Sequence, residues 1–217
     1  LAEDFVLSDQ LTTKLNKCFE KPEVLLKAHK FTGKKGDSVL LSTVCGDKPW
    51  HVKFVGLGKK NAHGVLDFET FRLALGCAIK TAKRLEVDTV ALAIPDAASF
   101  GMNAADAAQQ AVVIAHMATY VFDDFKDIKK AKTPWNAKIT FCGVSDAAAV
   151  TEGELIAGAV NKIRRYADTP PNIATPTFMA EEAKKIADEG GLKYTCFGKE
   201  RALELGMGGL LAVGAGS

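Results

Sequence analysis

The histidines of this 217-residue chain are the first candidates for metal or acid–base chemistry. There are four, at positions 29, 51, 63 and 116, and they lack the HxxxH or HxxEH spacing that places two imidazoles on one helix face. His116 lies in an apolar helical pattern, which favours a core histidine over a ligand. His51 and His63 flank a glycine-containing turn, which favours surface positions. The histidines therefore predict no zinc site.

Carboxylates and thiols are the next candidates. Asp123, Asp124 and Asp127 cluster at the end of a helical pattern, and although such a group could hold a divalent cation, the position is more typical of solvated side chains. The five cysteines are odd in number, widely spaced and form no CxxC pair, which favours reduced thiols in a cytoplasmic protein over a disulfide framework. Cys45 and Cys142 lie in apolar strand patterns, where we expect inert thiols.

Glycines offer the last candidate site. Gly56-Leu57-Gly58 follows a strand pattern, but a dinucleotide-binding loop requires a glycine where the chain has Asn61, so the pattern favours a turn with positive φ. A phosphate-binding Gly-Lys-Ser/Thr sequence does not occur, and residues 214–217 (GAGS) have the wrong order for a GxSxG elbow. The residues themselves thus predict no catalytic and no metal-binding residue, and substrate-binding residues are unknown.

Composition sets broad limits on function. The chain is 47% apolar and 25% charged, with a formal net charge of +2. Its lysines and arginines occur as short, scattered pairs, unlike the concentrated basic face of a nucleic-acid-binding protein. The longest apolar run, 111–117, is too short to span a bilayer. The chain begins at Leu1, so we expect a trimmed or incompletely recorded N-terminus, in which a targeting segment would not be visible.

The elements that must position any site alternate between strand and helix patterns over the first two-thirds of the chain. Their order, β-β-α-β-α-β after a first helix, predicts an α/β domain with a mixed or mostly parallel sheet flanked by helices. The helix around 104–122 is apolar nearly all round, so we expect other elements to cover it on more than one side. The expected elements are helix 8–20 capped by Ser8, strands 38–44 and 51–57, a helix starting at Asp67, strand 89–94, helix 104–122 capped by Asn103, and strand 137–142.

A second unit is expected after a long helix at 146–167, which must end before Pro170-Pro171. Thr175 caps the next helix, Pro176 takes its first position, and Gly190-Gly191 end it. The expected domains are 1–145, a linking helix at 146–169, and 170–217, which has too little core to stand alone. Within the third, we expect a strand at 192–197, a short helix at 199–205 and a strand at 210–213.

Two segments carry a family resemblance. Residues 168–176 read DTPPNIATP, and residues 207–217 read MGGLLAVGAGS. In this order they resemble the leucyl aminopeptidase family (cytosol aminopeptidases, peptidase M17), with weaker support from 55–59, 71–72 and 90–95. The family usually has Asn in the place of Asp168. The resemblance implies an α/β fold with a macro-domain-like N-terminal domain, a linking helix, and the beginning of a second α/β domain, that of the catalytic peptidase.

The resemblance also implies a function for a longer protein. Family members are cytoplasmic, hexameric hydrolases that remove N-terminal residues from peptides with two divalent cations, Mn or Zn. In the family the ligands lie in a Lys-x-x-x-x-Asp segment and an Asn-Thr-Asp-Ala-Glu-Gly-Arg segment that come after the stretch resembling 207–217. The second segment does not occur in this sequence, and the one Lys-x-x-x-x-Asp spacing, Lys83 to Asp88, lies in the part that resembles the N-terminal domain. We therefore expect an inactive N-terminal portion that binds neither cation.

Six residues in or next to the two segments have expected structural roles. By this interpretation Pro170, Pro171 and Asn172 shape the domain junction, and Gly206, Gly208 and Gly209 free the backbone for a close turn. Two other hypotheses stay open: a DNA-binding or oligomer-assembly domain, since some family members bind DNA, and a macro-like module that binds a nucleotide or ADP-ribose.

Overall fold

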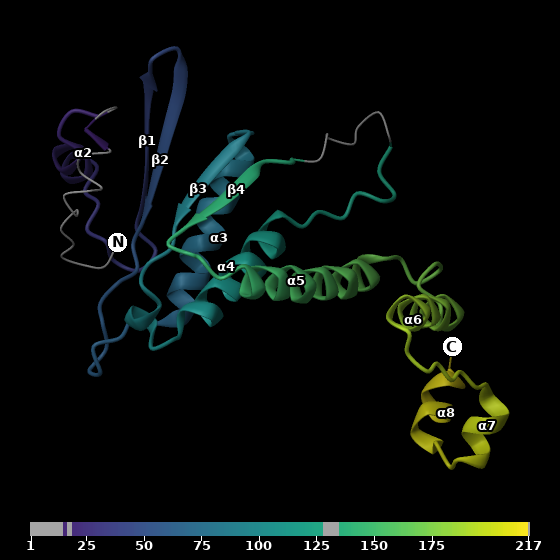
Figure 1. Ribbon diagram of the computed structural model, residues 1–217. Helices are drawn as coiled ribbons and strands as arrows, with labels where there is room; N and C mark the ends of the chain where they lie inside the picture. The colour runs from purple at the N-terminus through teal and green to yellow at the C-terminus, as the bar shows by residue number, and fades with distance from the viewer. Residues whose placement is uncertain (1–14, 17–18, 128–134, 217) are drawn as a thin grey trace. The chain divides into compact units, whose positions relative to one another are not determined.

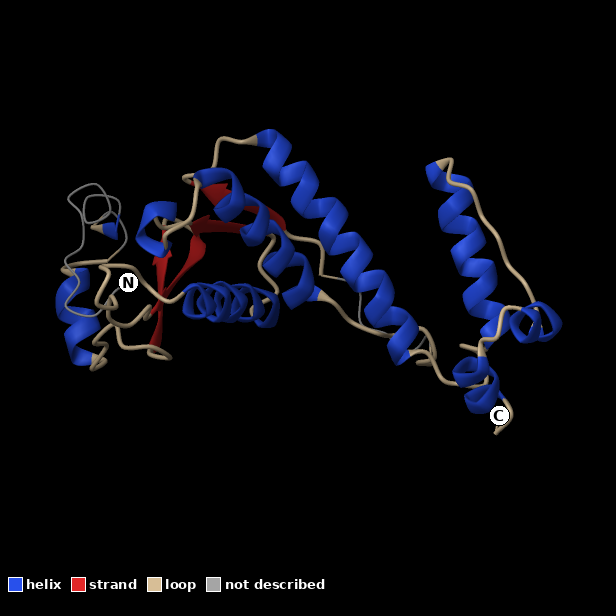
Figure 2. Cartoon of the chain, turned by 90° about the horizontal axis from the view of Figure 1, so that it is seen from below, coloured by secondary structure: helices blue, strands red, loops and turns tan. Residues whose placement is uncertain are grey.

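The computed structural model describes residues 15–16, 19–127 and 135–216, and the chain forms two compact units, residues 1–163 and 164–217 (Figure 1). Most of the helix expected at 8–20 lies outside the described residues. Unit 1 holds the strands, and the described part of unit 2 is made of helices and loops (Figure 2). The mixed α/β architecture, with small sheets flanked by helices, is confirmed.

The first sheet is a hairpin of β1 (Ser38–Cys45) and β2 (Lys48–Val55), paired antiparallel around a turn at Gly46-Asp47. Both strands were expected, but β2 begins and ends earlier than predicted. One face of the hairpin base is buried against α2 (Pro22–Ala28), a helix that the sequence patterns did not indicate. The cluster on this face contains Leu26, Phe31, Val39, Leu41 and Phe54.

The second sheet pairs β3 (Thr89–Ala93) with β4 (Lys138–Cys142) in parallel, with Thr89 opposite Lys138. Between them in sequence lie a short 3-10 helix, η1 (Ala97–Phe100), and helix α4 (Ala104–Thr119). The described strands thus form two separate two-stranded sheets, one antiparallel and one parallel, where the sequence predicted a single mixed sheet. Within the described part of the chain, each strand is therefore paired with another strand along one edge only.

Two helices of unit 1 begin after a capping side chain: Asn103 is the predicted cap, and Asp67, predicted as the first helical residue, is a cap instead. The Asp67 side chain accepts a hydrogen bond from the backbone N–H of Glu69 at the start of α3 (Phe68–Arg84), 3.1 Å away. Asn103 accepts one from the N–H of Asp106 at the start of α4, at 2.8 Å. Both side chains satisfy an amide that has no partner within its helix.

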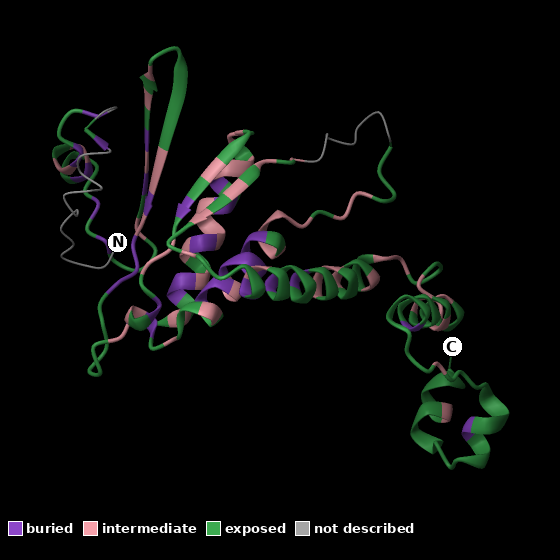
Figure 3. Ribbon diagram, in the orientation of Figure 1, coloured by how far each residue is buried: buried purple, intermediate pink, exposed green. Residues whose placement is uncertain are grey.

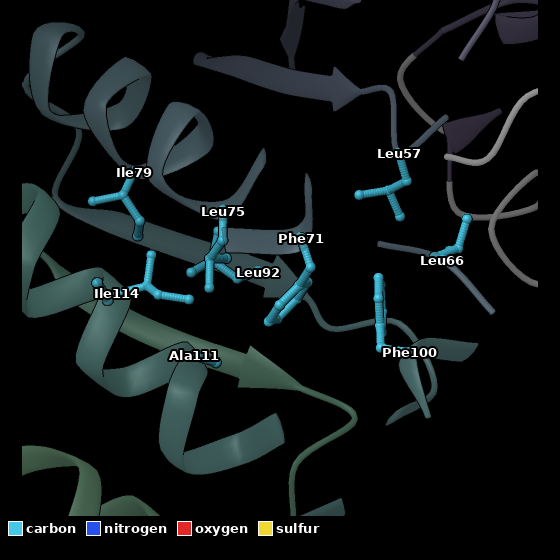
Figure 4. Close-up of a cluster of buried hydrophobic side chains, with 10 residues drawn as sticks. Leu57, Leu66, Phe71, Leu75, Ile79, Leu92, Phe100, Ala111 and Ile114 are labelled. Carbon is cyan, nitrogen blue, oxygen red and sulfur yellow. The ribbon is translucent and has the colours of Figure 1, made fainter. Parts of the chain in front are cut away.

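The main core of unit 1 lies between α3, α4 and the second sheet (Figure 4). From α3 it takes the buried stripe of Phe71, Leu75 and Ile79. Helix α4 is covered on a further side by α5 (Ala147–Asp168), whose Gly153 lies against it. The expectation that α4 is covered on more than one side is confirmed. The cluster contains Leu57, Leu66, Phe71, Leu75, Ile79, Leu92, Phe100, Ala111, Ile114 and Ala115.

Unit 2 contains the end of α5 and the helices α6 (Pro176–Gly190), α7 (Lys199–Glu204) and α8 (Gly208–Gly214). Two predictions are wrong here: residues 192–197 are not assigned to a strand, and residues 210–213 lie in α8. A strand satisfies its backbone by pairing with a neighbour, and the described residues of unit 2 include no strand. Helix α8 instead bonds locally, with the N–H of Leu211 donating to the carbonyl of Met207. Most of unit 2 is exposed (Figure 3).

Candidate functional site

The glycine turn is a crossing of two backbone segments. Gly58 has φ of 73°, so the predicted turn with positive φ is confirmed. Gly56 is required for a different reason, because its lack of a side chain lets two backbone segments approach closely: a Cβ built on it would lie 2.0 Å from the carbonyl oxygen of Lys34. The N–H of Gly58 donates to the carbonyl of Gly33 at 2.9 Å. Helix α3 starts only at Phe68, so the turn does not feed a helix N-terminus as a dinucleotide loop must.

A charged group near this crossing caps α3. The Asp67 carboxylate lies 2.9 Å from the Lys35 ammonium and accepts a second bond, also 2.9 Å, from the Thr70 hydroxyl. The Lys35 contact, then the Thr70 contact and the Glu69 amide, lower the pKa of Asp67 to about 2. The carboxylate is thus ionised at neutral pH, and its bonds serve the helix start.

The remaining sequence candidates are scattered. His116 is exposed, so its prediction as a core histidine is wrong. The ring Nδ1 of His51 is 2.8 Å from the hydroxyl oxygen of Ser42, in an exposed cross-strand pair of the hairpin. His63 lies in an exposed turn, where its N–H donates to the side chain of Asn61.

The acidic and thiol candidates are equally dispersed. Asp123 pairs with Lys126 at 2.5 Å. Cys142 is exposed, because alternate residues of β4 are open to solvent. The prediction of an inert thiol assumed a position in an apolar strand, and its reactivity stays a prediction. The described cysteines, Cys45, Cys77, Cys142 and Cys196, are free thiols.

A metal centre does not fit the residues that the structure describes. Within residues 15–16, 19–127 and 135–216, no group of three or more His, Cys, Asp or Glu side chains is placed to hold a metal ion. A two-cation centre needs several such ligands around each ion. The described part of the chain therefore supplies no such centre.

The proline-rich segment of unit 2 forms a hydrogen-bonded turn that leads into α6. The carbonyl of Pro170 accepts hydrogen bonds from the N–H groups of Ile173 and Ala174, both at 2.9 Å. Thr175 caps α6 by accepting from the N–H of Phe178 at 3.3 Å, and Pro176 takes the first helical position. The predicted cap is confirmed, and the turn closes on its own backbone.

Next to this turn is a polar network that the sequence analysis missed. The Tyr166 hydroxyl donates to the Glu182 carboxylate at 2.7 Å, and the other oxygen of Glu182 lies 2.5 Å from the Lys185 ammonium. The ring of Tyr166 meets that of Phe178 edge-on, with centroids 5.8 Å apart. Burial, then the bond to Glu182, raises the pKa of Tyr166 to about 12. The network fixes α6 to the end of α5. In the sequence, Tyr166 continues an apolar face of the helix at 146–167, and nothing there indicates its hydrogen bond to Glu182.

Comparison with known proteins identifies the family. A model described as the cytosol aminopeptidase family, N-terminal domain, matches residues 3–129, which is more than half of the chain. The chain belongs to the cytosol aminopeptidase family. A second model, for the catalytic domain of the cytosol aminopeptidase family, matches residues 161–217.

Solved structures show the same fold as this cytosol aminopeptidase family chain. A point mutant of tomato leucine aminopeptidase matches 83% of the chain at 23% identity and a TM-score of 0.65. The bottromycin maturation enzyme BotP in complex with Mn matches 88% at 19% identity and a TM-score of 0.64. A cytosol aminopeptidase from Coxiella burnetii matches 87% at 16% identity and a TM-score of 0.51. The chain spans about a third of the length of each, at 34%, 35% and 34%.

Proposed function

We propose that this chain forms the N-terminal domain and the first portion of the catalytic domain of a longer leucyl aminopeptidase, which hydrolyses N-terminal residues from peptides. The order of the two family matches along the chain, N-terminal domain at 3–129 and catalytic domain at 161–217, carries this proposal. The proposed domains are 1–145, a linking helix at 146–169, and 170–217.

In this proposal the longer protein is a metallopeptidase with two divalent cations, Mn or Zn. We expect the ligands to lie outside this chain; the described residues, which offer no cluster of metal-binding side chains, support this expectation. The similarity to BotP, solved in complex with Mn, supports metal dependence. We expect the 217-residue chain alone to be inactive.

The proposed setting is a homo-hexamer in the cytoplasm that acts on peptides. The hexameric assembly, the cytoplasmic location and the peptide substrates are all inferred from the resemblance to leucyl aminopeptidases. Within the described residues, the helices are too short or too polar to cross a membrane, which agrees with this setting.

Two measurements test the proposal. The intact mass of the denatured natural protein should exceed the 23.1 kDa of this chain about two- to threefold. The longer protein should release leucine from leucine amide when supplied with Mn or Zn, and exhaustive chelation should abolish the activity. The 217-residue chain, assayed in parallel, should be inactive. Activity that survives chelation contradicts the metallopeptidase proposal.

A further inference from the structure

Folding brings two lysine pairs together at the backbone crossing. Lys34-Lys35 lie in the loop before β1, and Lys59-Lys60 follow β2, so the pairs are far apart in the sequence. At the crossing, a Cβ built on Gly58 would lie 3.8 Å from the Cα of Lys35. One further peptide step places the Cα atoms of Lys35 and Lys59 at most about 9 Å apart. Pairs that are scattered along the chain are therefore neighbours in space.

The segments that meet here carry a local excess of positive charge. Residues 30–38 and 53–67 contain six lysines and two aspartates, a net charge of +4, whereas the whole chain has +2. The rest of the chain is therefore slightly acidic. Both aspartates already have partners: Asp37 bonds to a hydroxyl of its own loop at 2.5 Å, and Asp67 bonds to Lys35 at 2.9 Å. Like charges at such short range repel each other and attract an anion.

The backbone beneath the lysines is fixed by the core. Gly33, Gly56 and Gly58 are buried, and the side chain of Leu57 belongs to the main core (Figure 4). All four lysines of the crossing are exposed. Their side chains thus reach solvent from loops whose backbone is already held in place. Such preorganisation lowers the entropy cost of binding a ligand.

The loop at 33–36 (GKKG) also presents backbone donors. Its glycines have φ of 78° at Gly33 and 88° at Gly36. Within the described part of the chain, the N–H groups of Lys34, Lys35 and Gly36 make no hydrogen bond. Consecutive free N–H groups in a glycine-bounded turn bind anions, and GxxG loops are known to hold phosphate groups. The loop therefore combines ammonium groups with backbone donors, which together suit phosphate.

The form of this patch narrows the class of ligand. A nucleic acid is bound by a continuous basic face or by aromatic side chains that stack on its bases. Outside the two segments the chain is slightly acidic, and the aromatic residues of the segments, Phe31 and Phe54, are buried. Carboxylates are bound best by the planar fork of arginine, and the segments contain lysine but no arginine. A short, dense chain of phosphates matches four closely spaced lysines.

We propose that the crossing loops, residues 33–36 and 58–60, form a binding site for a short linear chain of phosphate groups. Inorganic polyphosphate and the triphosphate of a nucleotide share this chemistry. The phosphate oxygens accept hydrogen bonds from the N–H groups of the GKKG loop. The ammonium groups of Lys34, Lys59 and Lys60 neutralise the charge, while Lys35 keeps its contact with Asp67. The inference rests on residues of unit 1 alone and does not depend on the proposed function.

Titration calorimetry with inorganic tripolyphosphate tests the site in the 217-residue chain. We expect one bound ligand, and raising NaCl from about 50 to 200 mM should weaken the affinity by about 20–50-fold, as three or four cation contacts require. Orthophosphate should bind at least about tenfold more weakly, because it makes fewer of these contacts. Absence of tripolyphosphate binding at low salt overturns the proposal.

Other ligands distinguish the sources. Equal affinities of ATP and tripolyphosphate show that the site binds the triphosphate alone, and a higher affinity of ATP identifies a nucleotide as the source. A single-stranded oligonucleotide that binds more tightly than tripolyphosphate makes nucleic acid the ligand and overturns the proposal. Equal binding of polyglutamate overturns it as well, because the site then does not select phosphate.

A pair of double substitutions locates the site. Lys34→Gln with Lys60→Gln removes one exposed cation from each loop, and Lys80→Gln with Lys162→Gln removes the same charge from exposed positions of α3 and α5. The first variant should bind tripolyphosphate at least about tenfold more weakly and lower the slope of log affinity against log salt by about 1–2. The control variant should change neither. Equal losses in the two variants refute a site at the crossing.

The melting temperature of each variant checks that the fold is intact. Neither Lys34 nor Lys60 makes an ion pair within the described residues, so we expect no decrease. If the first variant does melt lower than the unaltered chain, Lys60→Gln alone repeats the test, with an expected decrease of about 1 in the salt slope. An unchanged slope for Lys60→Gln contradicts the proposal.

Discussion

Replacing Gly56 by alanine tests the backbone crossing. The new Cβ would lie 2.0 Å from the carbonyl oxygen of Lys34 and 2.7 Å from the carbonyl carbon of Gly33. These are backbone atoms, so no rotamer change relieves the contact, and normal packing needs a shift of more than about 1 Å. Such a shift breaks the bonds from Gly56 N–H to the Asp37 carbonyl, 2.8 Å, and from Gly58 N–H to the Gly33 carbonyl, 2.9 Å. At about 1 kcal/mol for each bond, plus the overlap, we expect a loss of about 2–4 kcal/mol.

Thermal unfolding followed by tryptophan fluorescence measures this loss, because Trp50 and Trp135 both lie in unit 1. The expected decrease in melting temperature is about 4–16 °C. Gly158→Ala is the matched control: it makes the same chemical change in an open position of α5, where alanine favours the helix by about 0.5–1 kcal/mol. A Gly56→Ala melting temperature within about 1 °C of the unaltered chain refutes the role assigned to the crossing.

Three further substitutions have expected outcomes. Gly153→Ala should destabilise unit 1 by about 1–2 kcal/mol, because its Cβ would lie 2.8 Å from a backbone oxygen of α4; a melting temperature that rises, as expected for Gly158→Ala, contradicts this packing. The lowered pKa of Asp67, about 2, means that its contribution to stability is full above about pH 4 and is lost as pH falls toward 2. Between pH 5 and pH 2, the melting temperature of Asp67→Asn should thus decrease less than that of the unaltered chain. Equal decreases for the two proteins contradict the stabilising role of the Asp67 cap. Tyr166→Phe should lower the tyrosinate absorbance that appears near pH 12 by the contribution of one tyrosine, since the pKa of Tyr166 is raised to about 12; an unchanged absorbance titration between pH 11 and pH 13 contradicts this.

Local chemistry made part of the fold predictable. The helix caps Asn103 and Thr175 were predicted because a short polar side chain before a helical pattern has a defined partner three residues away. Asp67 was predicted as the first residue of its helix and is its cap instead. The two strands of the hairpin were predicted because Gly46-Asp47 separates two apolar runs, whereas their antiparallel pairing is a finding of the structure. Each of these features depends on residues close in sequence.

Features that depend on distant residues were not predictable in this way. The strand expected at 192–197 needs a pairing partner, and propensity alone does not provide one. The approach of Gly56 to Lys34 joins residues 22 positions apart, and the bond from Tyr166 to Glu182 crosses a turn between two helices. The candidate site was predictable only as a family resemblance, because the described residues contain no cluster of metal-binding side chains.

The hairpin and its crossing also have a consequence for the order of folding. The turn between β1 and β2 is two residues long, whereas β3 and β4 pair Thr89 with Lys138 across 49 positions. Hairpins close in about 1–10 μs, and pairing of distant parallel strands is slower because a longer loop must be ordered first. The bond between Gly56 and Asp37 continues the hairpin at its open end. We therefore expect the crossing to form with the hairpin, before the second sheet, so that Gly56→Ala slows refolding as well as weakening the native state.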